Sequence, residues 1–249
     1  MFVLAVACRP PDRSQMTATA KDDWVRAYTL ADGGEVNINN PRGSVDIQGV
    51  DGESVEVRVE RIVHAINETA AKEVLPRLQM MEEATPQKVL VSGERLGGIV
   101  IGVSIEMSFH VRAPRTALIR ARTSGGELNV KGFSGHVILN GTNGGVRAED
   151  LAGGIEMRWF NGGANVGLAA IANDLVDVRV TNGPLNLLLA PTINANLSAT
   201  ATNGRIEVKA PKFEPLGDQT SRRVRGRLNA GGVPIELTTI NGNITVASQ

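Results

Sequence analysis

Apolar and polar positions repeat in steps of nine residues between residues 126 and 170. Glycine occupies positions 126, 135, 144, 153 and 162, and the second and fourth residues after each glycine are apolar or small. The intervening residues are mostly polar, as at Glu127, Asn129 and Arg147. This alternation is typical of short β-strands with one buried face. Because a nine-residue unit cannot bury its apolar side alone, the pattern predicts that the units stack on one another.

The same pattern continues on both sides of this stretch. Glycines at 34, 43 and 52 introduce earlier strands, of which 54–62 has the longest alternation. Asn143 and Asn161 are 18 residues apart, whereas Asn182 and Asn203 are 21 apart. The chain is therefore predicted to be all-β, a parallel β-solenoid (β-helix-like) with about 18–21 residues per rung and two strands in each rung.

The repeat is lost between about 64 and 115. Residues 67–75 have the composition of a helix, and strands are expected at 77–82 and 88–92, joined by a turn. Because the ends of a solenoid expose unpaired strand edges, we expect a small α+β insertion here, a helix–hairpin element that covers one end. A second charged excursion is expected at 212–227.

The N-terminus carries an apolar run that ends in small residues directly before Cys8, the single cysteine of the chain. This run resembles the lipobox of bacterial lipoprotein signal peptides. It predicts a signal segment at 1–8, lipidation of Cys8, a flexible polar tether at 9–23 and a β-domain at 24–249. A buried or incidental cysteine is the alternative. With one cysteine no intrachain disulfide can form.

An Asn-Gly corner recurs before successive strands. The corner residues are Asn143, Gly144, Asn161, Gly162, Asn182, Gly183, Asn203, Gly204, Asn241 and Gly242. In a parallel coil the asparagines of adjacent rungs would stack in one column about 4.8 Å apart, with amide-to-amide hydrogen bonds. The alternative is a series of independent Asn-Gly hairpins in an antiparallel meander. The pairing of Val146 distinguishes the two, because a coil pairs it with Ala164 and a meander with Val137.

The ordered series of corners, together with the helical stretch near 67–76 and the strand end at 111–114, resembles a bacterial family of β-strand repeats called "putative adhesin". The resemblance covers about residues 28–249. It implies a solenoid-like domain that is exported or attached to a membrane, and it supplies no catalytic residues. We therefore expect a non-catalytic lipoprotein domain of the cell envelope, in the outer membrane or periplasm. It would act as an adhesin-like binding or scaffold module for a protein or glycan partner. A regulatory or sensory envelope module is a further alternative.

The clearest candidate binding face combines Glu156, Arg158, Asp177 and Arg179, which occupy matching outward positions of neighbouring units. Two carboxylates beside two guanidinium groups would suit an acidic sugar, so an enzyme acting on envelope or extracellular polysaccharide is the alternative function. The same residues would equally serve to keep an exposed sheet soluble. Trp159 is expected at a corner beside them, facing out as a partner contact, or covered by the 212–227 excursion or by the insertion.

Composition argues against several other functions. Acidic and basic residues balance at 26 each and aromatic residues make up 3% of the chain, which disfavours nucleic-acid binding. Calcium-binding nonapeptides need a column of aspartates, yet the equivalent positions are Lys131, Asn140, Glu149, Arg158 and Gly167. The three histidines, His64, His110 and His136, lack metal-site spacing. No metal, cofactor or catalytic residue is therefore expected.

Overall fold

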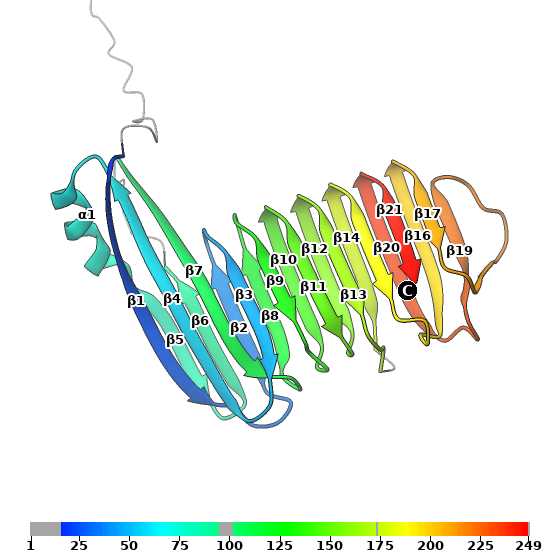
Figure 1. The fold of residues 1–249 in the computed structure, drawn as a ribbon, viewed down its shortest axis with the longest axis horizontal. Helices are drawn as coiled ribbons and strands as arrows, with labels where there is room; N and C mark the ends of the chain where they lie inside the picture. The colour runs from blue at the N-terminus through cyan, green and yellow to red at the C-terminus, as the bar shows by residue number, and fades with distance from the viewer. Residues whose placement is uncertain (1–15, 95–101, 173, 249) are drawn as a thin grey trace, which may run out of the picture.

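The computed structural model describes residues 16–94, 102–172 and 174–248. It confirms an all-β protein, built from two mixed sheets that pack around one core (Figure 1). Sheet A contains, in spatial order, β1 (Ala18–Thr29), β4 (Ser54–Ala65), β7 (Val103–Pro114), β3 (Val45–Val50), β9 (Leu128–Lys131), β11 (Val146–Leu151), β13 (Ala164–Leu168), β15 (Leu185–Leu189), β21 (Ile244–Ser248) and β17 (Ile206–Lys209). Sheet B contains β18 (Phe213–Pro215), β19 (Arg223–Leu228), β16 (Ala195–Asn203), β20 (Val233–Asn241), β14 (Val176–Asn182), β12 (Ile155–Asn161), β10 (Val137–Asn143), β8 (Leu118–Thr123), β2 (Glu35–Asn40), β6 (Lys88–Gly93) and β5 (Met80–Thr85).

Through the middle of the molecule the chain passes alternately from one sheet to the other. Each strand from β10 to β15 pairs in parallel with the strand two places before it. Val146 pairs with Ala164, and Val137 pairs with Ile155. The antiparallel meander of Asn-Gly hairpins is therefore wrong for this region.

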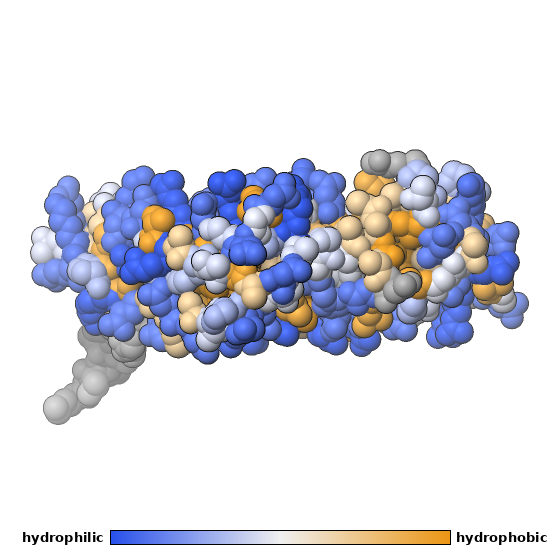
Figure 2. Space-filling view, turned by 90° about the horizontal axis from the view of Figure 1, so that it is seen from below, coloured by the Kyte–Doolittle hydropathy of each residue, from blue (hydrophilic) through white to orange (hydrophobic). Residues whose placement is uncertain are grey.

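The inward residues of successive strands stack to form the core. Val137, Ile155 and Val176 lie in register on three neighbouring strands, and all three are fully buried. Burial of each such side chain contributes roughly 1.5–3 kcal/mol to folding. The outward residues are largely polar, and a view from below shows a mostly hydrophilic surface with separate hydrophobic areas (Figure 2).

The last pair of strands does not follow chain order. β20 lies between β14 and β16, and β21 lies between β15 and β17. The corner column consequently runs from Asn182 to Asn241 and then to Asn203, whereas the sequence predicted Asn203 directly after Asn182. The Asn-Gly corners are identical in sequence, so the repeat spacing alone does not determine which of them are neighbours.

The predicted tether is partly wrong. Residues 18–23 belong to β1, which pairs antiparallel with β4 from Ala18–Ala65 to Thr29–Ser54. Ion pairs of 2.6 Å from Arg61 to Asp22 and 3.0 Å from Arg58 to Asp23 hold this part of the strand. Charged residues that pair across strands made a true strand look like a polar linker. Cys8, the signal segment and the rest of the tether lie outside the described residues.

The region 64–115 is not the separate helix–hairpin cover that the sequence predicted. It contains a helix, α1 (Glu68–Val74), and a 3₁₀ turn, η2 (Leu75–Arg77), close to where the sequence predicted a helix. Its strands, however, are part of the two sheets, because β7 lies between β4 and β3, and β6 pairs in parallel with β2. Among the described residues, no helix is long and apolar enough to span a membrane.

Antiparallel strands flank the parallel region at both ends (Figure 1). β1, β4 and β7 in sheet A and the β5–β6 pair in sheet B form one end. The β16–β19–β18 group forms the other end.

Candidate binding surface

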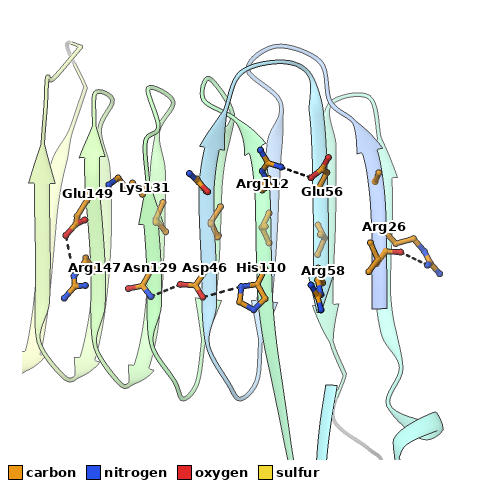
Figure 3. Close-up of a pocket in the computed structure, with 17 residues that line it drawn as sticks. Arg26, Asp46, Glu56, Arg58, His110, Arg112, Asn129, Lys131, Arg147 and Glu149 are labelled. Atoms are coloured by element: carbon orange, nitrogen blue, oxygen red, sulfur yellow. Dashed lines mark hydrogen bonds and ion pairs between the residues drawn. The ribbon is translucent and has the colours of Figure 1, made fainter. Parts of the chain in front are cut away.

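One candidate surface is a hollow on the outer side of sheet A, with a volume of 910 Å³ (Figure 3). It extends across β1, β4, β7, β3, β9 and β11. β1, β4 and β7 have 12 residues each, whereas β3 has 6 and β9 has 4. Strands twist along their length, so long strands beside short ones curve away from them and leave a concave face.

Strand register arranges the outward side chains of this hollow in two rows. The first row consists of Val25, Arg58, His110, Asp46, Asn129 and Arg147. The second row consists of Ala27, Glu56, Arg112, Gln48, Lys131 and Glu149. We call these two rows the hollow face. The hollow face could not be predicted from the sequence, because its members come from strands far apart in the chain and no local spacing indicates that they are neighbours.

Polar contacts connect neighbouring strands along the hollow face. Asn129 Nδ2 donates to Asp46 Oδ1 at 2.7 Å, and His110 Nδ1 lies 3.6 Å from the other oxygen of the same carboxylate. Arg112 and Glu56 are 3.4 Å apart, and their side chains are 60% and 55% exposed. Exposed pairs of this kind contribute only about 0–1 kcal/mol. These contacts orient the side chains. Because each contact is weak, a ligand can replace it at little cost.

Arg58 is the most strongly paired cation of this surface. Its Nε and Nη2 atoms donate to the two carboxylate oxygens of Asp23 at 3.2 and 3.0 Å. These hydrogen bonds, and then the attraction of the same carboxylate, raise the pKa of Arg58. It remains a permanent positive charge at the rim.

The face predicted from sequence lies on sheet B. Glu156 pairs with Asp177, and Arg158 pairs with Arg179, so the structure brings these four residues together as expected. Each acid has a cation nearby: Asp177 Oδ1 accepts from Arg179 Nε at 2.9 Å, and Glu156 lies 3.7 Å from Arg158. Asp177 is only 8% exposed, so its charge is directed mainly at Arg179.

His136 extends this sheet B cluster, which the sequence did not indicate. Its Nδ1 atom lies 2.7 Å from Asp174 Oδ2, and its Nε2 atom lies 3.5 Å from Glu156. Burial opposes the ionisation of Asp174. Hydrogen bonds from His136 and from the backbone N–H groups of Leu175 and Gly154 outweigh it, and the pKa of Asp174 lies below its usual value. The cluster fastens the turn before β14 to the starts of β10 and β12.

Trp159 was predicted to face outward, and this is wrong. Its side chain is 1% exposed, whereas that of Phe160 is 51% exposed. The indole Nε1 donates to the carbonyl oxygen of Gly144 at 2.8 Å. A Cβ on Gly141, the paired residue on β10, would lie 2.2 Å from the indole ring. Trp159 is therefore a core residue that fills the space above a glycine.

The corner asparagines form a continuous ladder of side-chain amides. Asn161 donates to Asn143 at 2.9 Å, Asn182 to Asn161 at 2.8 Å, Asn241 to Asn182 at 2.6 Å, and Asn203 to Asn241 at 2.9 Å. The following glycine is required at Gly162, where φ is +132° and a Cβ would lie 1.8 Å from the carbonyl oxygen of Gly144. The corners are thus structural, and they keep the two sheets in register.

The fold of this chain is similar to that of solved structures. A crystal structure of a "putative cell adhesion protein" from Clostridium sporogenes matches 92% of this chain and 100% of its own, with a TM-score of 0.51 and 10% identity. The two chains share a fold. The resemblance drawn from the Asn-Gly corners is thereby confirmed at the level of fold.

Two further structures show weaker matches. A "putative adhesin" from Bacteroides fragilis has 10% identity and a TM-score of 0.28, over 91% of this chain and 98% of its own. A "putative adhesin" from Parabacteroides distasonis has 12% identity and a TM-score of 0.28, over 92% and 97%. No family model matches the chain, and no curated protein matches its sequence.

Proposed function

We propose that this chain is a non-catalytic binding module of the cell envelope, a β-solenoid whose hollow face contacts the ligand. One observation carries the proposal: two registered rows of side chains cross six strands and line a hollow of 910 Å³, and every member is polar except Val25 and Ala27 on the edge strand β1. Polar side chains repeated about 4.8 Å apart across the strands suit an elongated polar ligand, a glycan or an extended protein segment.

The lining chemistry supports a polar ligand. Pockets for small molecules are mostly apolar with a few polar groups. This hollow instead carries many charged side chains, since Arg58, Asp46, Glu56, Arg112 and Lys131 all line it. The exposed pair between Arg112 and Glu56 is weak, so replacing it with ligand contacts costs little.

The paired acids on sheet B favour binding over catalysis. A glycosidase needs one carboxylic acid and one carboxylate that are directed at the substrate. Glu156 and Asp177 are instead directed at Arg158 and Arg179. A polysaccharide enzyme is thus the less favoured function, and the experiment below includes an outcome that would reveal it.

The proposed location is the cell envelope, in the outer membrane or periplasm, with a lipid anchor at Cys8 of the exported protein. The lipobox-like run before Cys8 supports it. The shared fold with a protein described as a "putative cell adhesion protein" is in agreement. Under this proposal the β-domain lies outside the membrane, and its hollow face is available to a protein or glycan partner.

The test compares two double variants with equal charge changes. Arg58→Ala/Arg112→Ala removes two cations from the hollow face, and Arg120→Ala/Arg158→Ala removes two from sheet B. Retention of labelled protein on isolated bacterial envelopes and on immobilised envelope glycans is measured for both. We expect the first variant to bind at least about tenfold more weakly, because two charge-assisted contacts are lost, and the second to bind like the wild type. Equal losses, or the release of reducing sugar ends during incubation, would refute the proposal.

A further inference from the structure

The end of the molecule formed by β16, β18 and β19 is strongly basic. Residues 205–227 contain seven basic and three acidic residues, a net charge of +4, in a chain whose overall net charge is zero. This concentration of charge includes β17 of sheet A and β18 and β19 of sheet B, at the end opposite the long strands beside the hollow face (Figure 1).

Two arginines of β19, Arg223 and Arg225, have no charge partner among the described residues. Arg223 and Arg225 are exposed, and their side chains have no hydrogen bond or ion pair with any part of the chain that the structure describes. Arg227, by contrast, lies 2.7 Å from Glu214. On this sheet face the other nearby acid is Glu236, which pairs with Ser198, the partner of Arg225. Glu236 is therefore about 10 Å from β19, beyond the ~8 Å screening length at physiological salt.

Neutral hydrogen-bonding groups flank these cations. In the antiparallel pair of β16 and β19, Arg223 is opposite Thr200 and Arg225 is opposite Ser198. Residues directly opposite in such a pair point to the same side of the sheet. Arg223 and Arg225 are about 6.8 Å apart along their strand. The result is a linear strip of two free guanidinium groups beside two hydroxyl groups, which we call the basic strip.

The backbone of the basic strip is held firmly. Gln219 closes the loop before β19: its Nε2 donates to the carbonyl oxygens of Leu216 and Arg225 at 2.9 and 3.0 Å, and its Oε1 accepts from the Arg225 N–H at 2.9 Å. On the inner side, the Phe213 ring packs so closely on Gly226 that a Cβ there would lie 2.4 Å from it. A ligand at the strip therefore has little backbone to order.

We propose that the basic strip binds an acidic polysaccharide. Carboxylate groups of the polymer would accept hydrogen bonds from Arg223 and Arg225, and its hydroxyl groups would exchange hydrogen bonds with Ser198 and Thr200. An extended chain with alternating charges and hydroxyls matches a linear strip better than a compact anion does.

Other polyanions fit less well. Docking to an anionic membrane uses apolar side chains that insert, and in the described β18–β19 hairpin only Leu216 is a large exposed hydrophobic residue. Single-stranded nucleic acids stack on aromatic rings, and the single aromatic side chain of that hairpin, Phe213, packs on the inner side. The basic strip is also separate from the hollow face, so this inference is independent of the proposed function.

The experiment measures binding of the wild type and two double variants to immobilised alginate, a polymer of uronic acids, at physiological salt. Arg223→Gln/Arg225→Gln removes the strip. Arg42→Gln/Arg122→Gln removes two other exposed arginines, whose side chains have no ion pair with the described part of the chain, with the same change in net charge. Far-UV circular dichroism verifies that each variant is folded. Dextran, vesicles of phosphatidylglycerol and single-stranded DNA are tested alongside.

We expect the wild type to bind alginate and not dextran. The strip variant should bind alginate at least about tenfold more weakly, and the control variant should bind within about twofold of the wild type. Equal weakening in both variants would show that net charge alone is responsible and would overturn the proposal. Binding to vesicles or DNA in preference to alginate, or no binding of the wild type to alginate, would also overturn it.

Discussion

Trp159 and Gly141 provide a direct test of why a glycine is placed in the middle of the corner strand β10. The two residues pair across β10 and β12, and a Cβ on Gly141 would lie 2.2 Å from the indole ring. Trp159 is 1% exposed, so the ring has little room to move away. Gly141→Ala should therefore overpack the core, and this effect should depend on the tryptophan.

The magnitudes follow from the structure. Trp159→Ala removes a buried ring and leaves the Gly144 carbonyl without its 2.8 Å indole donor, and we expect a loss of about 3–5 kcal/mol. Gly141→Ala alone should lose about 1–3 kcal/mol through overpacking. In the double variant the new methyl group occupies part of the vacated space. Its stability should then be close to that of Trp159→Ala alone, which gives a coupling free energy of about 1–3 kcal/mol.

Urea unfolding followed by far-UV circular dichroism measures this cycle, because Trp159 is one of only two tryptophans and its loss changes the fluorescence signal. Equal slopes of the unfolding curves would show that the variants unfold in the same way. If Gly141→Ala were as destabilising with Ala at 159 as with Trp, the ring contact would not be the reason for the glycine, and the reasoning would be refuted.

Three further predictions follow. Asn161→Asp removes the amide that donates to Asn143 at 2.9 Å and should destabilise the protein by about 1 kcal/mol in urea unfolding. Asn165→Asp is the matched control and should have little effect, because the Asn165 side chain accepts a hydrogen bond from Asn186 and the new carboxylate can still accept it. Because the pKa of Asp174 is lowered in the folded state, its contribution to stability is present above its unfolded pKa and is lost as the pH falls through the folded value. The urea midpoint of the wild type should thus fall more steeply on acidification than that of Asp174→Asn; equal slopes would contradict this. Cys8 should carry a lipid in protein expressed in bacteria, and mass spectrometry showing a different mature N-terminus would contradict it.

The parallel pairing and the corner column could be predicted from the sequence, because both depend on a local signal that repeats. At the five Asn-Gly corners the asparagine amide donates to a neighbouring corner and the glycine allows close backbone approach, so the same pair recurs at these positions. The position of Asn241 between Asn182 and Asn203 could not be predicted, since identical corners pair equally well with one another.

The predicted orientation of Trp159 was wrong because the structure repeats after two strands, one in each sheet, and not after one. In sheet B the alternation continues to the end of β12, so Trp159 is buried and Phe160 is exposed. In sheet A an irregularity between Ala148 and Leu151, with a positive φ of 53° at Asp150, shifts the alternation and buries Leu151. A nine-residue frame treats Phe160 and Leu151 as equivalent, and the bulge makes them different.

The asparagine ladder also determines how the protein should age chemically. Asn-Gly pairs lose ammonia when the glycine nitrogen attacks the asparagine side chain to form a five-membered succinimide ring, which water then opens to leave a carboxylate. In the ladder these nitrogens already have partners. The backbone N–H groups of Gly144, Gly162, Gly183 and Gly242 each donate to the backbone carbonyl oxygen of the asparagine in the next rung, at 2.8–3.1 Å. The nitrogen of Gly204, at the outer end of the column, has no such acceptor among the described residues. Deamidation during storage should therefore begin at Asn203 and advance inward, each new carboxylate removing the donor that held the next corner in place.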